Sequence, residues 1–297
     1  MSPPLPAALA DWRATGRDLH VHGRRVFVHD LPGPTADAPV LAFLHGFPTS
    51  SHDLAPALAA LRARCRVVAH DHVGFGLSEK PPGDAYGYSL FEQADVALGV
   101  WAALGVSRAH LVAHDYGTSV LTELLARRDR GLLPLDVASI TLSNGSVHLD
   151  LARLSWPQKL MRSPRVGPLF TRLASERLFH RRMRALFGRP DAVDPATVGA
   201  MWALVVHDGG RAALTPLSRY LDERVRYARR WHGALERCDL PAHVLWGRAD
   251  PIAVPAIAER LAAEIPGATL TWLDDVGHYP TLEAPDRWAA AALAALP

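Results

Sequence analysis

The stretch Ala109–Gly117, AHLVAHDYG, decides the fold of this 297-residue chain. Apolar residues up to Ala113 indicate a buried strand, and a helical pattern begins at Gly117. Asp115 lies between them, with small residues two positions before and after it, as the tight turn of a nucleophile elbow requires. The N-terminus of the following helix favours a negative charge. The ordinary alternative for Asp115 is an acidic helix N-cap.

Strands and helices alternate on both sides of this turn. The predicted strands are Arg25–Val28, Val40–His45, Arg66–Ala69, Ala109–Ala113, Val137–Leu142, His243–Trp246 and Thr269–Leu273. The predicted helices are Ser89–Leu104, Gly117–Arg130, Pro255–Ile265 and Pro285–Leu296, and Ser89 with Glu92 forms a capping box. This alternation predicts an α/β fold with a mostly parallel sheet covered by helices on both faces.

One long interval interrupts the alternation. Residues 149–238 are rich in arginine, helical in pattern, divided by prolines and poor in strand-like runs. We therefore expect residues 1–148 and 239–297 to form the α/β core, and residues 149–238 to form an inserted helical cap.

The composition excludes several classes of protein. Hydrophobic residues make up 49% of the chain, and 32 basic against 30 acidic side chains leave a net charge of +2, which excludes a disordered chain and suggests no nucleic-acid partner. The two cysteines form no CxxC motif, so a disulfide scaffold and a cysteine-rich zinc site are not expected. The chain has no apolar run long enough for a membrane span and no signal-peptide pattern at its start, so we expect a cytoplasmic protein.

The small net charge conceals an uneven distribution. The interval 149–238 has 17 basic and 8 acidic residues, a balance of +9, so the remainder carries −7. Solvated arginine faces on cap helices are the ordinary explanation. The functional alternative is a basic cap that attracts anionic substrates.

Three further motifs follow predicted strands. The segment His45–Pro48 (HGFP) places the backbone N–H of Phe47 where it can join that of Tyr116 in an oxyanion hole. Asp250 follows the strand that ends at Trp246, where it can orient a histidine, and His278 follows the last strand as a candidate base. The chain order of nucleophile, acid and histidine is that of α/β-hydrolases.

These motifs resemble the α/β-hydrolases with a cap domain, in the branch of epoxide hydrolases and haloalkane dehalogenases. The resemblance extends from about Gly23 to Trp288. Within the branch, the chain is most similar to the mesoderm-specific-transcript-like group. The segments that carry this similarity are HGFPTSS (45–51), SLFEQAD (89–95), HDYG (114–117), LSNG (142–145), RWHGAL (230–235) and HYPTLE (278–283). The resemblance implies an eight-stranded sheet.

An aspartate in the nucleophile position indicates a particular chemistry. A carboxylate needs no base to attack a saturated carbon, and the attack gives an alkyl-enzyme ester. His278, held by Asp250, then activates water for hydrolysis of the ester at Asp115. This mechanism needs a small-molecule substrate and water but no cofactor. The His-rich stretches lack convergent carboxylates, so no metal site is expected.

The leaving group distinguishes epoxide from halide chemistry. By resemblance, an epoxide oxygen takes a proton from a cap tyrosine, and Tyr220 is the candidate, with an aromatic that anchors the cap as its ordinary alternative. A second donor is usual, but no tyrosine lies between Leu149 and Gly210, which leaves His148, His180 or His207 as substitutes. Trp156 is a candidate wall of the pocket, as is Trp202, although packing is the ordinary role of each.

The leading prediction is therefore hydrolysis of an epoxide to a diol by Asp115, His278 and Asp250, in a monomer or homodimer. A haloalkane or haloacid dehalogenase is the first alternative. Against it, Tyr116 replaces the usual Trp after the nucleophile, and Phe47 replaces the Asn that many haloalkane dehalogenases carry. An ester or lactone hydrolase also fits the motifs, and so does a ligand-binding sensor without catalysis.

Overall fold

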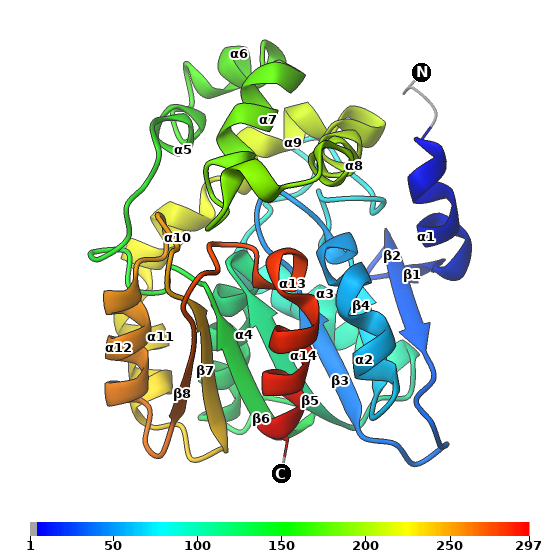
Figure 1. Ribbon diagram of the computed structural model, residues 1–297, viewed down its shortest axis with the longest axis vertical. Helices are drawn as coiled ribbons and strands as arrows, with labels where there is room; N and C mark the ends of the chain where they lie inside the picture. Colours follow the sequence, from blue (N-terminus) through cyan, green and yellow to red (C-terminus); the bar gives the residue numbers. More distant parts are fainter. Residues whose placement is uncertain (1–4, 297) are drawn as a thin grey trace.

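An eight-stranded sheet lies at the centre of the computed structural model, which describes residues 5–296 (Figure 1). Its strand order is β1-β2-β4-β3-β5-β6-β7-β8; β1 and β2, and β2 and β4, pair antiparallel, and all other pairs are parallel. The strands are β1 (Arg17–Val21), β2 (Arg24–Leu31), β3 (Val40–Leu44), β4 (Arg66–His70), β5 (Arg108–His114), β6 (Asp136–Ser143), β7 (Ala242–Gly247) and β8 (Thr269–Leu273). The predicted mostly parallel, eight-stranded sheet and the seven predicted strands are confirmed.

The edge strand β1 was not predicted from the sequence. Its residues, RDLHV, are mostly exposed or half-buried, and only Val21 is fully buried. Because most side chains of this edge strand are exposed or only partly buried, it lacks the run of apolar residues by which the central strands are recognised in the sequence. Pairing with β2, where Leu19 lies opposite Val26, is what defines it.

Helices cover both faces of the sheet, as predicted. In Figure 1, α2 (Leu58–Arg62) and α14 (Pro285–Ala294) lie in front, while α3 (Leu90–Ala103), α4 (Tyr116–Arg128) and α11 (Ala228–Glu236) lie behind, with α12 (Pro255–Glu264) packed against α11. The predicted capping box of α3 is present, because the Ser89 hydroxyl accepts the Glu92 N–H and the Glu92 carboxylate accepts the Ser89 N–H. Short helices precede β1 (η1, Ala7–Leu9, and α1, Ala10–Thr15), follow β3 (η2, Ser51–Ala57) and precede α14 (α13, Pro280–Glu283).

A helical layer between β6 and β7 covers the edge of the sheet where the parallel strands end (Figure 1). It contains α5 (Trp156–Met161), α6 (Gly167–Arg172), α7 (Glu176–Arg184), η3 (Pro190–Ala192), α8 (Pro195–Val206), η4 (His207–Gly209), α9 (Gly210–Leu217) and α10 (Tyr220–Arg226). The chain then returns to the sheet through α11.

Helix α11 packs on the sheet layer through one buried carboxylate. Glu123 of α4 accepts hydrogen bonds of 2.8 and 2.9 Å from Arg230 and of 2.9 Å from the Trp231 indole. Both donors belong to the RWHGAL segment, so this motif anchors the end of the insertion rather than forming the site. We propose that the cap proper ends before α11, earlier than Cys238.

Within residues 5–296, the helices are all too short or too polar to cross a lipid bilayer.

Candidate active site

Asp115 lies in the sharp turn between β5 and α4. Its φ of 46° and ψ of −109° form a conformation that a non-glycine residue adopts only under constraint. The constraint comes from both of its backbone groups. Its N–H donates to the Ser143 carbonyl at 3.1 Å, and its carbonyl accepts the N–H of Thr118 at 3.1 Å and its hydroxyl at 2.6 Å.

Small residues allow this turn to approach the neighbouring strand. A Cβ atom on Gly117 would lie 2.2 Å from the Leu44 carbonyl oxygen, and one on Gly46 would lie 2.8 Å from the Asp115 Cβ. Both substitutions would collide with backbone or with the turn itself. Gly117 is one of the two small residues expected beside Asp115, and Gly46 is a further close approach that the sequence did not indicate.

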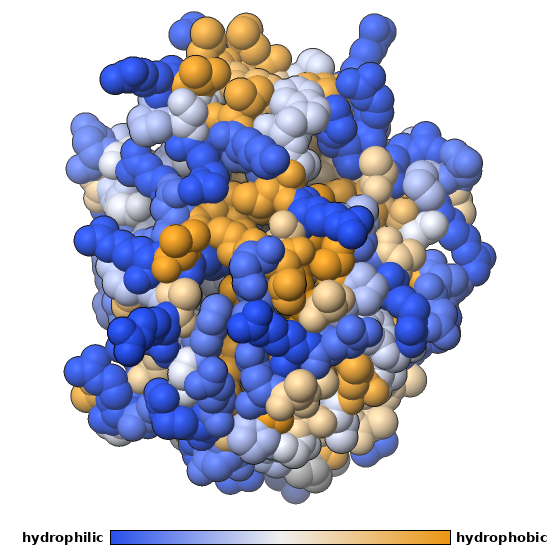
Figure 2. Space-filling view, turned by 90° about the vertical axis from the view of Figure 1, so that its left-hand side faces the viewer, coloured by the Kyte–Doolittle hydropathy of each residue, from blue (hydrophilic) through white to orange (hydrophobic). Residues whose placement is uncertain are grey.

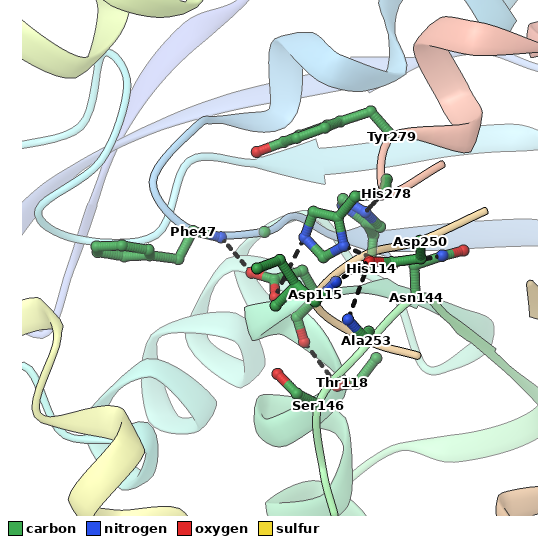
Figure 3. Close-up of polar contacts among 12 residues, drawn as sticks. Phe47, His114, Asp115, Thr118, Asn144, Ser146, Asp250, Ala253, His278 and Tyr279 are labelled. Atoms are coloured by element: carbon green, nitrogen blue, oxygen red, sulfur yellow. Dashed lines mark hydrogen bonds and ion pairs between the residues drawn. The ribbon is translucent and has the colours of Figure 1, made fainter. Parts of the chain in front are cut away.

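Three side chains predicted from separate motifs meet at this turn (Figure 3). The Asp115 Oδ1 accepts the Phe47 N–H at 2.7 Å, and its Oδ2 lies 3.6 Å from His278 Nε2. The other ring nitrogen of His278, Nδ1, lies 2.7 Å from Asp250 Oδ2. All three side chains are almost completely buried. Asp115, His278 and Asp250 therefore form one connected row.

Asp250 is fixed by four hydrogen bonds. Its Oδ1 accepts the backbone N–H groups of Ile252 at 2.8 Å and Ala253 at 2.9 Å. Its Oδ2 is shared between His278 and the Asn144 amide, which donates at 2.8 Å. A carboxylate held by this many donors cannot turn away from the histidine.

The charge of His278 follows from its two carboxylate neighbours. Burial disfavours the imidazolium, but the Asp250 carboxylate and then Asp115 offset burial and raise the pKa of His278 to about 9. A pKa in this range favours the positively charged histidine at neutral pH. Any step that removes the Asp115 charge lowers this pKa and increases the fraction of neutral His278 that can accept a proton at neutral pH.

A cavity of about 300 Å³ lies between the row and the helical layer. Asp115, His278 and Phe47 line it, opposite mostly apolar side chains of the insertion: Met161, Phe170, Leu178, Phe179, Trp202 and Leu214. A second, more polar hollow of about 440 Å³ beside α13 contains none of the three connected residues. We therefore place the candidate site in the apolar cavity, which fits a small, largely apolar molecule.

Tyr220 lies beside the oxyanion-hole candidates, behind Phe47, and is not itself among the residues that line the cavity. Its ring centroid is 5.1 Å from that of Tyr116 and 5.6 Å from that of Phe47, and the side chain is buried. Burial and the nearby Asp115 carboxylate raise the pKa of Tyr220, whereas Arg224 and the Gln158 side chain lower it. Gln158 lines the cavity directly, and its Oε1 accepts the Ser155 N–H at 2.8 Å.

Two predicted site residues lie elsewhere. His148 is buried, its Nε2 lies 2.6 Å from Glu264 Oε1, and it does not line the cavity, so its expected role as a leaving-group donor is wrong. The side chain of Trp156 is 42% exposed and packs against Phe170, so the expectation that it forms a cavity wall is also wrong. Helix α5 turns this ring outward, and its neighbours on the helix face the cavity.

Sequence reasoning missed the buried Arg224. Its guanidinium donates to the hydroxyls of Ser119 and Ser146 at 2.7 Å each, and to the Asp115 carbonyl at 3.4 Å. It also lies 4.5 Å from the centre of the Tyr220 ring. Nothing in the sequence marks it, because it is one of 17 basic residues in its interval. Among residues 5–296 it has no carboxylate partner, and it connects α10 to the turn at Asp115.

Comparison with known proteins agrees with this architecture. Residues 39–285 match the family model described as alpha/beta hydrolase fold. The chain is 40% identical to the putative hydrolase LipZ of Mycobacterium tuberculosis, over 97% of this chain and 98% of that protein. It is 35% identical to the mesoderm-specific transcript protein of Mus musculus, over 95% and 86%.

Dehalogenases are also similar. The chain is 31% identical to haloalkane dehalogenase 2 of Mycobacterium tuberculosis, over 91% of each chain. The crystal structure of haloalkane dehalogenase DbeA from Bradyrhizobium elkani superimposes with a TM-score of 0.78 at 24% identity, over 94% of this chain and 99% of that one. The predicted branch and the similarity to the mesoderm-specific-transcript group are confirmed.

Proposed function

The chain belongs to the α/β-hydrolase fold family and is a hydrolase, and from that premise we propose that it opens an epoxide through a covalent ester at Asp115. The observation that carries the proposal is the aspartate itself. It occupies the constrained turn with one carboxylate oxygen bonded to the Phe47 N–H and the other directed at His278. A carboxylate in this position suits attack on a saturated carbon, for which no prior deprotonation is needed.

In the first step, Asp115 Oδ2 attacks one epoxide carbon while the carbon–oxygen bond of the ring breaks. The product is an ester of Asp115, and the ring oxygen leaves as an alkoxide that takes a proton. Tyr220 is the proposed source, because its raised pKa keeps the phenol protonated and it lies beside Tyr116 and Phe47. Gln158 is the proposed second partner, since Ser155 holds its carbonyl oxygen, its amide group can donate, and it lies close enough to Tyr220 to lower the pKa of that phenol.

In the second step, His278 removes a proton from water, and the hydroxide attacks the ester carbonyl carbon of Asp115. The Phe47 and Tyr116 N–H groups stabilise the oxyanion, which collapses and releases the diol. The proton taken by His278 returns to the Tyr220 phenolate, directly or through solvent, so that one water is added to one epoxide. Because ester formation neutralises Asp115, the pKa of His278 falls, and His278 releases its proton to solvent before it acts as the base. It takes a proton from solvent again when the Asp115 carboxylate is restored.

Dehalogenation is the second candidate. The 31% identity with a haloalkane dehalogenase favours it, and Trp202 lines the cavity and carries an indole N–H that can face a halide. The same ester at Asp115 forms in both reactions, so the two differ only in the leaving group. The position directly after Asp115 lacks an indole donor, because Tyr116 occupies it.

A substrate panel and a labelling experiment test these proposals separately. Terminal and internal epoxides and small chloro- and bromoalkanes are incubated with the protein, and diol, chloride and bromide are measured. Diol formation that the Asp115→Asn variant lacks is the expected result, whereas halide release without diol favours dehalogenation. No product from any compound, with ligands that still raise the melting temperature, would favour a sensor.

The labelling experiment uses ¹⁸O-water and excess enzyme, so that each site turns over once. The label should appear in the Asp115 carboxylate, because water attacks the ester carbonyl carbon. Label found only in the diol would show direct attack of water on the substrate and exclude the ester. A serine-type ester hydrolase would leave Asp115 unlabelled as well, but would release acid from ester substrates.

A further inference from the structure

The top of the helical layer carries an unusual concentration of exposed apolar side chains. Among residues 5–296, six large hydrophobic side chains are strongly exposed, and four of them lie between residues 156 and 173. Val166, Leu169 and Leu173, exposed by 47%, 60% and 72%, form what we call the apolar crest, and Trp156 lies beside it. Figure 2 shows this apolar patch at the top of the molecule, where α6 lies in Figure 1, with hydrophilic residues around it.

The crest is one face of one helix. Its residues are spaced by three and four positions across α6 and its two caps, so their side chains project to the same side. The buried side of α6 carries Gly167 and Thr171, and the half-buried Phe170, which lies between that side and the crest, lines the cavity. Soluble proteins rarely expose large contiguous apolar patches. An exposed apolar patch that is surrounded by polar residues marks a surface that contacts a partner or a membrane.

Basic side chains surround the crest. Residues 155–184 contain eight basic residues and one acidic residue, a balance of +7. Within the described part of the chain, only Arg162 and Arg184 of these eight form ion pairs with carboxylates. Five of the remaining six are exposed, and we call them the basic rim: Lys159, Arg165, Arg172, Arg177 and Arg181. The positive charge of the rim is therefore available to an external anion.

We propose that this face of the cap docks on an anionic lipid bilayer. An apolar helix face flanked by Lys and Arg is the pattern of a segment that lies in the membrane interface, with leucines in the acyl boundary and cations at the phosphates. A second copy of the chain fits less well, because a symmetric dimer through this face would oppose two rims of the same charge. Free phosphate or a soluble anion would leave the crest exposed to water.

The same three helices form the wall of the cavity. Pro157 of α5, Phe170 of α6 and Leu178 of α7 face the cavity, while the crest and rim face outward from those helices. A bilayer bound at the crest is therefore adjacent to the helices that form the cavity wall. The docking itself does not depend on the chemistry at Asp115.

The test is co-sedimentation of the full chain with sucrose-loaded vesicles of phosphatidylcholine, or of phosphatidylcholine and phosphatidylglycerol in equal amounts. The wild type should sediment with the anionic vesicles and much less with the neutral ones, and added salt should weaken this binding. The crest variant Leu169→Ser/Leu173→Ser should lower the partition coefficient at least about tenfold. The rim variant Arg172→Glu/Arg177→Glu should abolish the preference for anionic vesicles.

Matched controls are available elsewhere on the surface. Leu132→Ser/Val225→Ser removes two apolar side chains of similar exposure, and Arg64→Glu/Arg130→Glu reverses two exposed arginines of the core. Both control variants, and Asp115→Asn, should bind vesicles as the wild type does. Thermal unfolding of each variant is measured, and vesicle binding is compared only among variants that are folded at the temperature of the assay.

Several outcomes overturn the proposal. Failure of the wild type to bind anionic vesicles does so, as does binding by the crest variant equal to that of the wild type. If the control variants lost as much vesicle binding as the crest and rim variants, binding would depend on the overall net charge or hydrophobicity of the protein and not on this face. A wild-type dimer that the crest variant dissociates would assign the crest to self-association. Because vesicle binding is measured without substrate, its failure is distinguishable from failure of the epoxide proposal.

Discussion

The Asn144 amide donates a 2.8 Å hydrogen bond to the same Asp250 oxygen that lies 2.7 Å from His278 Nδ1. Asn144 follows β6, and Asp250 follows β7. The two residues thus adjoin one another at the carboxyl edge of neighbouring strands. The amide holds the carboxylate in place while Gly247 N–H holds the amide at 2.9 Å.

We expect Asn144→Ala to lower kcat about tenfold, because Asp250 keeps its two backbone donors but loses the one beside His278. The exchange Asn144→Asp/Asp250→Asn should recover part of the activity that Asp250→Asn loses, since it moves the carboxylate to the other partner of the same hydrogen bond. Steady-state kinetics of the four proteins checks this. An exchange variant no better than Asp250→Asn would show that only the β7 position can orient His278.

His278→Gln should separate the two proposed steps. Glutamine cannot remove a proton from water, but Asp115 can still attack, so an alkyl-enzyme ester should accumulate. Intact-mass spectrometry after mixing with substrate should show one adduct per chain, located at Asp115 by peptide mapping. Asp115→Asn/His278→Gln is the control and should show no adduct. Turnover by His278→Gln at the wild-type rate would exclude His278 as the base.

The rate of ester hydrolysis should rise with pH. Burial lowers the pKa of His278, but the carboxylates of Asp250 and Asp115 raise it to about 9 in the free protein, and the base must be neutral to act. Ester formation removes the Asp115 contribution, so the pKa of the intermediate should lie below 9. Single-turnover measurements between about pH 6 and 10 test this. A hydrolysis rate that does not change over this range would contradict it.

Arg224→Met should lower kcat about tenfold with a smaller effect on KM, because the guanidinium holds the Asp115 carbonyl and contacts the Tyr220 ring. Arg224→Lys keeps the charge but cannot bond to Ser119 and Ser146 as a planar fork does, so it should recover stability more than kcat. Thermal unfolding and steady-state kinetics are measured together. If Arg224→Met loses stability but keeps its kcat, Arg224 only attaches α10 to the turn at Asp115.

Asp53 is expected to make the protein less stable as pH rises. Burial raises its pKa from 3.8 to about 8, with the Thr49 hydroxyl as its partner, so the native state keeps a proton that the unfolded state has lost. Between about pH 4 and 8 the unfolded state binds fewer protons, and the free energy of unfolding falls with pH. Asp53→Asn should therefore gain about 1 kcal/mol or more at pH 7, and the gain should vanish near pH 4.

Urea unfolding at the two pH values measures this difference. Asp274→Asn, which changes a carboxylate that is 80% exposed, is the control and should alter stability little. An Asp53→Asn variant that is less stable than the wild type at pH 7 would show that Asp53 is ionised and paired in the native state.

The sequence alone was sufficient for the fold and for the three central residues. Asp115, Asp250 and His278 each follow a strand with a strong apolar signal, and parallel strands end at the same edge of the sheet, so their meeting could be predicted. The capping box at Ser89 and Glu92 is equally local. Strand β1 could not be predicted, because its stability comes from pairing with β2 rather than from its own residues.

Only the tertiary structure decided what surrounds those three residues. The orientation of the short helices between β6 and β7 depends on contacts with other helices, so Trp156 faces outward and Gln158 faces the cavity. His148, which precedes these helices, pairs with Glu264. Arg224 carries no local signal, and its place under Asp115 results from the path of α10 over the sheet. The residues at the ends of parallel strands are positioned by the strands that precede them in the sequence. The residues that face them from the helical layer are positioned by packing between helices, which the local sequence does not determine.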